Sequence, residues 1–269
     1  MTIPALGEYP LPTQSQLPGP RVSWEFDPTR AALLIHDMQK YFLDFYADGF
    51  PPLIDNVAKL RKLDVPVYFT AQPPKQTAES RGLLTDRWGP GLQDRDEIVD
   101  PLAPGPDDVV LTKHRYSAFI RSDLAARLRD QGKDQLIICG VYAHIGITAT
   151  AMDAFSLDIK PFVPADAIAD FTQERHYAAM EHLAATCSYV TTVDNLVTDD
   201  PTLDDIRAQV CALLDEPVDD DADLAEAGLD SIKVMDLVGS WRAAGHQVAV
   251  ADLVANPTIR GFHNALLGE

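Results

Sequence analysis

The stretch QLIICGVYAHIGITATAMDAFSLDIKPFV, residues 135–163, contains two short apolar runs separated by a segment long enough for a helix. The runs are Gln135–Gly140 and Lys160–Val163. Strands that are apolar along their whole length are typical of a sheet that is buried on both faces. The stretch therefore predicts a strand, a helix and a second strand that runs parallel to the first.

Runs of the same kind recur on both sides of this stretch. They lie at Ala31–Ile35, Val65–Ala71, Val109–Thr112 and Tyr189–Val193, and helix-length segments separate most of them. Alternation of buried strands with helices predicts an α/β domain in which helices cover both faces of a parallel sheet. The Pro-rich residues 1–28 indicate an extended arm laid over this domain.

Polar residues follow several of the predicted strands at the point where each strand ends. Asp37, Gln72 and Lys113 come just after three of the runs, and the turn Tyr142–Gly146 follows a fourth. Sites in parallel sheets form at the carboxyl ends of the strands. We therefore expect these residues to meet at one edge of the sheet.

Composition limits the classes of partner. The chain of 269 residues carries a formal net charge of -19, so a phosphate backbone or an anionic membrane would repel it in the absence of a basic patch. The cysteines show no paired spacing, and the first residues lack the features of a signal peptide. No stretch approaches the roughly 18 apolar residues of a transmembrane helix. We expect a reduced cytoplasmic protein that binds neither nucleic acid nor membrane.

The charge pattern changes near residue 199. From there to the end the chain has fifteen acidic and four basic residues, yet it holds enough large apolar residues for a small core. Asp199-Asp200-Pro201 predicts a linker at Asn195–Thr202. Helices are predicted at Leu203–Leu214, Ser231–Ala244 and about Val250–Ala255, with Gly245 and Asn256-Pro257 as breaks before a last helix. The domains are thus predicted at 1–198 and 202–269, the second a small all-α bundle of four helices.

Five ordered blocks carry a family resemblance. They are LLIHDMQKYF (33–42), YFTAQP (68–73), RGLLTDRWGPG (81–91), LTKHRYSAF (111–119) and CGVYAHIGITATAMDAFSLDIKPFVPADAIADF (139–171). Together they resemble the isochorismatase branch of the cysteine-hydrolase superfamily. The resemblance implies a Rossmann-like parallel sheet with Asp37, Lys113 and the position of Gly146 at its carboxyl edge. It also implies a homodimer formed through this domain.

Gly146 stands where the hydrolytic relatives have their nucleophilic cysteine. Cys139 lies upstream in an apolar run, where cysteines are usually inert packing residues. The departure argues against an acyl-enzyme and matches the isochorismatase branch. The resemblance to that branch implies hydrolysis of the enol ether of isochorismate to 2,3-dihydro-2,3-dihydroxybenzoate and pyruvate. That reaction requires an acid that protonates the terminal vinyl carbon. We assign Asp37 as this acid, whereas a plain strand-terminal Asp is the structural alternative.

We assign Lys113 and Gly146 to the catalytic set with Asp37, and the other residues of the expected site to substrate binding. Lys113 would hold Asp37 and the enolpyruvyl carboxylate, Gln72 would donate to an ether or carboxylate oxygen, and Arg81 would bind a carboxylate. Each is otherwise an ordinary surface or turn residue. The pocket wall is expected from aromatic residues that could instead be core: Phe42, Trp88, Tyr116 and Tyr142. Gly146 would provide space and the free backbone N–H groups of a helix start, with a plain N-cap glycine as the alternative.

Metal is not expected at this edge. His36, His114 and His144 lie near it, but no acidic or thiol ligands stand at a familiar spacing.

The segment EAGLDSIKVMDLVGSWRAAGHQVAVADLVANPTI, residues 226–259, resembles a carrier domain of non-ribosomal peptide synthesis. The resemblance implies 4'-phosphopantetheine attached to Ser231, an aryl thioester on that arm, and a role in catechol siderophore biosynthesis. Implied partners are a phosphopantetheinyl transferase, an aryl-AMP ligase that activates 2,3-dihydroxybenzoate, and a condensation domain. In isolation, a serine at this place is often only an N-cap. A phosphodiester would be tolerated there by free backbone N–H groups.

The second carrier helix is expected to bury Val234, Leu237, Val238 and Trp241 and to leave Met235 on another face. Met235, Val250 and Val254 are our predicted docking patch for partner enzymes, unless they belong to the small core. Two other functions stay open: a carrier or scaffold with an inactive hydrolase domain, and a hydrolase of amino-deoxyisochorismate. The fused carrier disfavours the latter.

Overall fold

A computed structural model describes residues 6–197, 201–214, 216–243, 246 and 248–267. The chain divides into two compact units, Met1–Val197 and Thr198–Glu269. The predicted linker Asn195–Thr202 crosses this division, but residues 198–200 lie outside the described residues. So do Ala244 and Gly245, which were predicted to end the second carrier helix and to break the chain after it.

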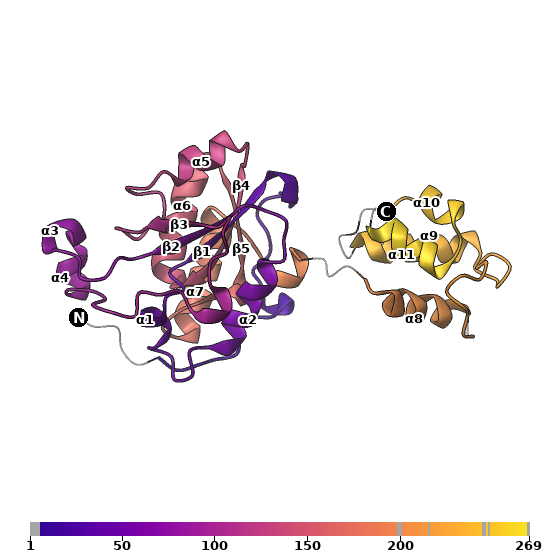
Figure 1. The fold of residues 1–269 in the computed structure, drawn as a ribbon, viewed down its shortest axis with the longest axis horizontal. Helices are drawn as coiled ribbons and strands as arrows, with labels where there is room; N and C mark the ends of the chain where they lie inside the picture. The colour runs from indigo at the N-terminus through magenta and orange to yellow at the C-terminus, as the bar shows by residue number, and fades with distance from the viewer. Residues whose placement is uncertain (1–5, 198–200, 215, 244–245, 247, 268–269) are drawn as a thin grey trace. The chain divides into compact units, whose positions relative to one another are not determined.

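A parallel sheet forms the centre of the first unit (Figure 1). Its strands are β1 (Ala31–His36), β2 (Val67–Ala71), β3 (Val109–Thr112), β4 (Gln135–Val141), β5 (Lys160–Pro164), β6 (Ile168–Ala169) and β7 (Tyr189–Thr191). Their order is β3-β2-β1-β4-β5-β7, with β6 paired to β4, and every pairing is parallel. The predicted α/β fold class is confirmed.

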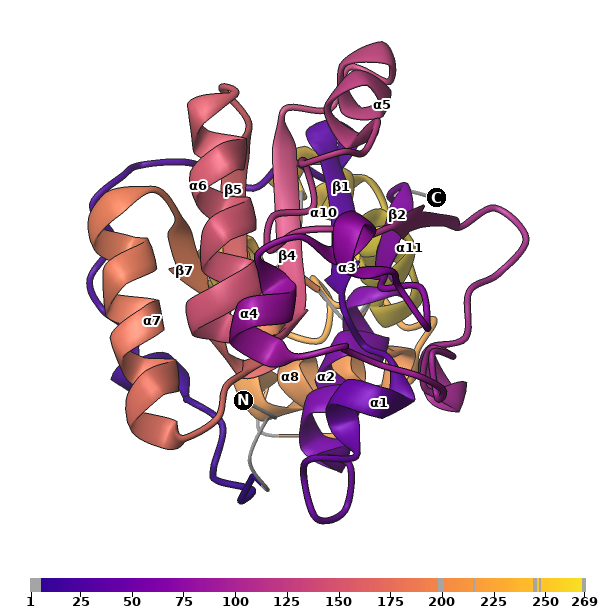
Figure 2. The same ribbon diagram turned by 90° about the vertical axis from the view of Figure 1, so that its left-hand side faces the viewer.

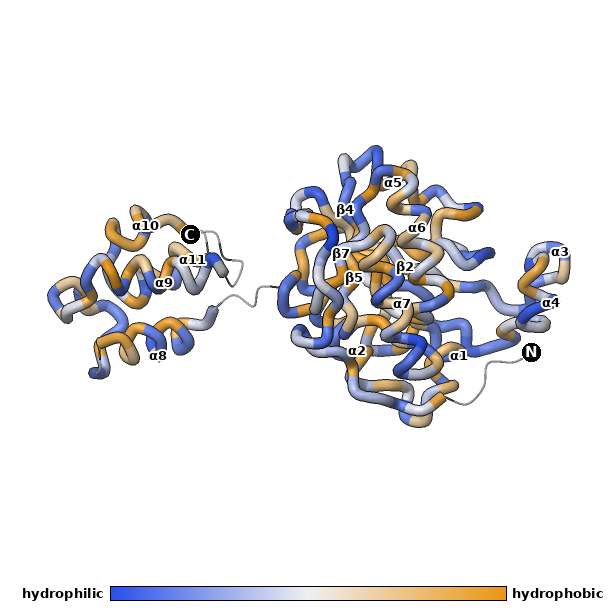
Figure 3. The backbone as a smooth tube through the Cα atoms, turned by 180° about the vertical axis from the view of Figure 1, so that it is seen from behind, coloured by the Kyte–Doolittle hydropathy of each residue, from blue (hydrophilic) through white to orange (hydrophobic). Residues whose placement is uncertain are grey.

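Helices cover both faces of this sheet, as Figure 2 shows from the side. They are α1 (Lys40–Leu43), α2 (Pro51–Leu60), α5 (Leu124–Asp130), α6 (Thr148–Ser156) and α7 (Gln173–Thr186). The short helices α3 (Ala78–Arg81) and α4 (Leu84–Trp88) lie away from both faces, as Figure 1 shows. Leu33 and Ile35 of β1 share one apolar core with α2, whereas Ala32 and Leu34 share the other with α5, α6 and α7. Successive strand residues point to opposite faces, so both must be apolar, and Figure 3 shows apolar stretches along the central strands.

The strands β1, β4 and β5 each end one residue later than predicted, and three differences are larger. Val65 and Pro66 precede β2, although the Pro66 carbonyl still accepts a hydrogen bond from Leu33 N–H at 2.9 Å. β7 ends at Thr191 because Val193 begins a 3-10 turn. β6 was not predicted, since a strand of two residues leaves no periodicity in the sequence.

The N-terminal segment lies against the first domain. Tyr9, Leu11, Trp24 and Phe26 pack on the core that contains α2, and Leu6 N–H donates to the Phe45 carbonyl at 2.7 Å. Short 3-10 turns interrupt the otherwise extended chain. Apolar side chains thus hold this segment to the domain from residue 6 onward.

The second unit contains α8 (Leu203–Leu214), α9 (Ser231–Ala243), α10 (Val250–Ala255) and α11 (Ile259–Leu267). Its core is made of Ile206, Val210, Leu224, Leu229, Val234, Leu237, Val238, Trp241, Val248, Leu253, Ile259, Phe262 and Leu266. The Trp241 indole N–H donates to Gln209 Oε1 at 2.8 Å. The predicted all-α second domain is confirmed, with the helices at the predicted positions. Among the described residues, no helix combines the length and apolarity needed to cross a bilayer.

Candidate functional site

Asp37 ends β1 in an unusual backbone conformation. Its φ is 53°, in the left-handed region that few residues other than glycine adopt. The Asp37 N–H lies 3.3 Å from the Thr70 carbonyl and 3.1 Å from the Thr70 hydroxyl, which holds this conformation at the end of β2. Such backbone strain persists where surrounding contacts fix it, and it clusters at functional sites.

The Asp37 carboxylate forms a buried ion pair. Lys113 Nζ donates to Asp37 Oδ2 at 2.6 Å, and Thr70 Oγ1 donates to Asp37 Oδ1 at 2.7 Å. Lys113 follows β3, where its N–H donates to the Ala71 carbonyl at 2.9 Å. Three neighbouring strands therefore supply one acid, one ammonium and one hydroxyl to the same point.

The charge state of Asp37 follows from these neighbours. Burial alone would raise the pKa of the Asp37 carboxyl, but the Lys113 ammonium and the hydrogen bonds outweigh burial and hold this pKa below its ordinary value. Burial lowers the pKa of the adjacent His36 to about 4, so its imidazole is neutral at pH 7. Asp37 is therefore ionised in the resting protein.

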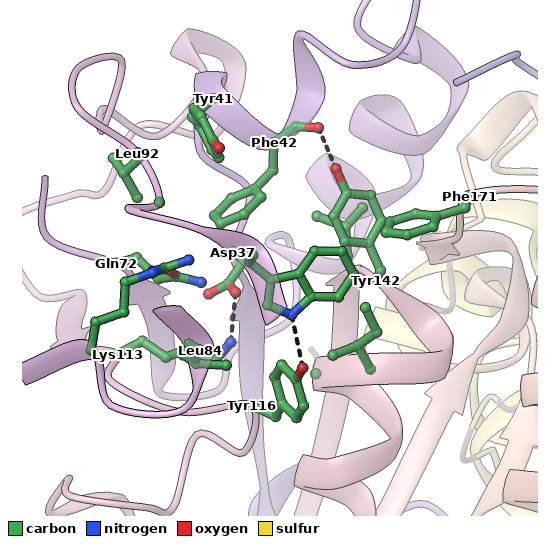
Figure 4. A pocket seen from close by; sticks show the side chains of 16 residues that line it. Asp37, Tyr41, Phe42, Gln72, Leu84, Leu92, Lys113, Tyr116, Tyr142 and Phe171 are labelled. Carbon is green, nitrogen blue, oxygen red and sulfur yellow. Dashed lines mark hydrogen bonds and ion pairs between the residues drawn. The ribbon is translucent and has the colours of Figure 1, made fainter. Parts of the chain in front are cut away.

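A cavity of about 600 Å³, including its open mouth, lies over this ion pair (Figure 4). Its lining is Asp37, Tyr41, Phe42, Gln72, Arg81, Leu84, Trp88, Gly91, Leu92, Lys113, Tyr116, Val141, Tyr142, Ile145, Gly146 and Phe171. Every residue predicted for the active site from the sequence lies in this lining. Their roles stay predictions.

Arg81 brings a buried cation to the cavity. Its Nε donates to the Gly89 carbonyl at 2.8 Å, and its Nη1 donates to Gln72 Oε1 at 3.3 Å. Within the described part of the chain its hydrogen-bond partners are neutral oxygens. A β-carbon on Gly91 would lie 2.4 Å from Arg81 Nη1, so the glycine makes room for the guanidinium. A buried guanidinium without a carboxylate partner suits an anionic ligand.

Arg115 holds the helix that carries Arg81. Arg115 Nη1 donates to the Ser80 carbonyl at 3.0 Å and to the Arg81 carbonyl at 3.3 Å, both at the end of α3. Gly82 follows with a φ of 58° and leaves space for this guanidinium. The contact ties α3 to the segment that carries Lys113, so the two cations of the cavity are positioned together.

Aromatic side chains form the opposite wall. The Tyr142 hydroxyl donates to the Phe42 carbonyl at 2.8 Å, so its proton is not available to a ligand. The Trp88 indole N–H donates to the Tyr116 hydroxyl at 2.8 Å. Phe171 lies edge-on to Tyr142, with ring centroids 4.7 Å apart. The wall suits a flat or weakly puckered ring.

Gly146 differs from its expected placement. It was expected at a helix start, but it lies inside a π-helical turn, Ala143–Ile147, whose N-cap is Tyr142 and which leads into α6. Asp170 Oδ2 accepts the N–H of His144 at 2.6 Å, and Asp170 Oδ1 accepts His144 Nδ1–H at 2.5 Å. A buried carboxylate therefore occupies the beginning of this turn at the N–H of His144, and the role of the Gly146 N–H stays a prediction.

Several lining residues were missed by the sequence argument, among them Tyr41, Leu84, Leu92, Ile145 and Phe171. Phe171 is the last residue of the sequence block 139–171, but nothing in its spacing distinguishes it from a core residue. No group of three or more His, Cys, Asp or Glu side chains that could hold a metal ion occurs within the described residues.

Ser231 is the first residue of α9 and is exposed. Asp230 Oδ1 accepts the N–H groups of Ile232 at 3.0 Å and Lys233 at 2.9 Å, so Asp230 is the residue that caps the helix. Among the described residues, no hydrogen bond engages the Ser231 hydroxyl. The serine is thus free for modification, whereas the expected free N–H groups beside it are occupied by Asp230.

The predicted docking residues lie outside the carrier core. Met235 is 53% exposed, Val250 36% and Val254 65%, and Ile232, which the sequence argument did not include, is 64% exposed. The four residues of α9 that were predicted to face the core are buried, namely Val234, Leu237, Val238 and Trp241. The alternative that these three residues belong to the core is therefore not supported.

Comparisons with known proteins agree with this architecture. The isochorismatase domain family matches residues 31–195, and the phosphopantetheine attachment site family matches residues 204–266. Enterobactin synthase component B of Escherichia coli is 43% identical over 100% of this chain and 99% of its own length. An isochorismatase of Bacillus subtilis is 43% identical over 99% of this chain and 96% of its own length.

A further relative and a solved structure match the first domain. A phenazine biosynthesis protein of Pseudomonas aeruginosa is 50% identical over 72% of this chain and 98% of its own length. A cysteine hydrolase structure from Pseudomonas syringae pv. phaseolicola has a TM-score of 0.59 at 24% identity over 66% of this chain and 96% of its own, which supports the fold alone.

Proposed function

Because the chain belongs to the isochorismatase family and joins that domain to a phosphopantetheine carrier domain, we propose that it hydrolyses isochorismate and carries an aryl group on Ser231. The observation that carries the proposal is the buried Asp37–Lys113 pair beneath a cavity that has a glycine at the nucleophile position. Such a site offers a proton and cations but no group for covalent catalysis.

The proposed chemistry begins at the enol ether. Asp37 gives its proton to the terminal vinyl carbon, and the neighbouring carbon becomes an oxocarbenium ion. Water adds to that carbon and returns one proton to Asp37. The bond from this carbon to the ring oxygen then breaks as the added hydroxyl becomes the carbonyl of pyruvate, and the proton of that hydroxyl passes to the ring oxygen. Pyruvate and the dihydroxy product leave, and one water is consumed.

Asp37 must be protonated for the first step, although it is ionised in the resting protein. We infer that substrate binding supplies the change. A substrate carboxylate shares the Lys113 ammonium and adds negative charge near Asp37, and both effects raise the pKa of Asp37. Different pH profiles of kcat/KM and kcat are therefore expected, because the first reports the free enzyme and the second the complex.

Two cations match the two carboxylates of the substrate. Lys113 lies against Asp37 and would take the enolpyruvyl carboxylate, while the guanidinium of Arg81 would take the ring carboxylate. Gln72, which contacts Arg81, would donate its amide N–H groups to an oxygen of the ligand. Phe42 and Tyr142, which line the cavity, would lie against the ring of the substrate.

The carrier domain implies partner enzymes, and we propose three kinds. A phosphopantetheinyl transferase would esterify the Ser231 hydroxyl, an aryl-AMP ligase would load 2,3-dihydroxybenzoate, and a condensation domain would accept it. When attached, 4'-phosphopantetheine supplies a thiol that holds the aryl group as a thioester. The free hydroxyl of Ser231 and the exposed residues Met235, Val250 and Val254 support this assignment. Catechol siderophore synthesis in the cytoplasm, by a homodimer, is the setting we propose.

The test is release of pyruvate from isochorismate, followed by coupling to lactate dehydrogenase. Wild type and Ser231→Ala should be active, and Asp37→Asn should lose roughly 10²–10⁴-fold in kcat. Mass spectrometry after incubation with coenzyme A and a transferase should show modification of wild type and not of Ser231→Ala. A folded but inactive wild type would leave a carrier or scaffold as the function.

A second substrate has some support. The 50% identity to a phenazine biosynthesis protein covers the first domain, and amino-deoxyisochorismate contains the same enol ether. The fused carrier disfavours it, because an amino product of that reaction needs no thioester. A higher kcat/KM for the amino compound than for isochorismate would reverse our choice.

A further inference from the structure

His36 fills the space that a side chain at position 146 would need. A β-carbon on Gly146 would lie 2.1 Å from Cε1 and 2.8 Å from Nε2 of the His36 imidazole. Contacts this short do not occur between non-bonded atoms, so either the imidazole or the turn would have to move. The His36 imidazole therefore requires a glycine at position 146, and this requirement does not depend on any ligand.

The imidazole of His36 is not free to move away. It is fully buried, its Nδ1–H donates to the Val141 carbonyl at 2.8 Å, and its Nε2 lies 3.3 Å from the Tyr116 carbonyl. Gly140 also lies close to the backbone of His36. A β-carbon on Gly140 would be only 2.2 Å from the His36 carbonyl oxygen, so this position too has no room for a side chain. The ends of β1 and β4 and the segment after β3 thus enclose this ring.

The ring also lies beside the acid. His36 Nδ1 is 3.8 Å from Asp37 Oδ2, so the volume that the imidazole takes is next to the carboxylate and close to Lys113. A thiol with that volume available would face both groups. A thiolate formed there would compete with Asp37 for the Lys113 ammonium.

We propose that His36 and Gly146 are a matched pair in which the imidazole excludes a nucleophilic side chain and keeps the site for proton transfer. His36 is then a specificity-determining residue, which acts by occupying space rather than by touching substrate. The chemical meaning of the pair rests on the proposed function. The geometry of the pair does not rest on the proposed function, and it can be tested without isochorismate.

The first test is a double-variant cycle on the complete chain. Gly146→Ala should lower the Tm of the first domain by roughly 2–12 °C through overpacking. In the background of His36→Val, a shorter residue that suits a strand, the same change should cost much less. Gly19→Ala is the control, because a β-carbon there meets no atom within 4 Å. An equal loss in both backgrounds would refute the pairing.

The second test asks whether the vacated volume accepts a nucleophile. Gly146→Cys combined with His36→Val should be alkylated by iodoacetamide at position 146 much faster than unfolded peptide thiols at equal pH, because Lys113 lowers the pKa of the thiol. Adding Lys113→Met should abolish that excess rate, which a merely structural effect would not do. If His36→Val does not fold, His36→Asn keeps an N–H donor for the Val141 carbonyl and replaces it. Absence of enhanced alkylation in a folded variant would overturn the proposal.

Discussion

Thr70→Val tests how the acid is controlled. The Thr70 hydroxyl donates to Asp37 Oδ1 at 2.7 Å, and valine replaces it by a methyl group of nearly the same volume. Thr70 is only 1% exposed, so water has little access to the vacated position. The Asp37 N–H still has the Thr70 carbonyl as an acceptor at 3.3 Å. The change therefore acts chiefly on the carboxylate.

The magnitude follows from the worth of that hydrogen bond. A hydrogen bond to a charged group contributes about 1.5–3 kcal/mol. It favours the ionised carboxylate, and one pKa unit corresponds to about 1.36 kcal/mol, so its loss should raise the pKa of Asp37 by roughly 1–2 units. Since the protonated acid is the reactive form, activity should persist to higher pH in the variant by a similar amount.

The assay is pyruvate release measured as kcat/KM and kcat across the acidic and neutral range. The alkaline limb of both profiles should move upward, with the kcat limb above the kcat/KM limb in each protein. Thr112→Val, at an exposed threonine that ends β3, should leave both limbs in place. An unchanged limb in folded Thr70→Val, or a limb moved to lower pH, would refute the assignment of Asp37 as the acid.

Three further outcomes are expected. Arg115→Gln frees the carbonyls that end α3, so KM should rise several-fold with a smaller change in kcat, whereas the exposed Arg129→Gln should change neither. Lys113→Met leaves Asp37 buried without a cation and should cost about 3–5 kcal/mol at neutral pH in urea unfolding. The folded-state pKa of Asp37 is then raised, so stability should recover as the pH falls; a loss that does not depend on pH would contradict this. Met235→Asp should slow aryl loading while the far-ultraviolet circular dichroism stays native, and a loss of helical signal would instead place Met235 in the core.

Much of the fold can be predicted from local patterns in the sequence. The runs that became β1 and β4 are apolar along their whole length, which predicts burial on both faces, and the parallel arrangement follows from the helices between the strands. Asp37 and Lys113 could be placed at one edge because a parallel sheet brings strand ends together. These predictions needed no knowledge of side-chain packing.

Other features depend on contacts that sequence separation hides. Gly146 was interpreted through the missing nucleophile, but its neighbour is His36, far away in the chain and reached only through the β1–β4 pairing. Asp230, rather than Ser231, caps α9, because both residues suit that position and only the backbone geometry decides. Phe171 lines the cavity through the turn after β6, a strand too short to predict.

The separate apolar cores have a consequence for how such a chain can change. The described core residues of the second unit all come from 203–266, and the cores of the first unit all come from residues before 198. Recombination at the boundary would exchange one whole half without exposing the interior of the other. Each unit would therefore keep its own apolar interior when the other is exchanged, so recombination at this boundary preserves the core of both.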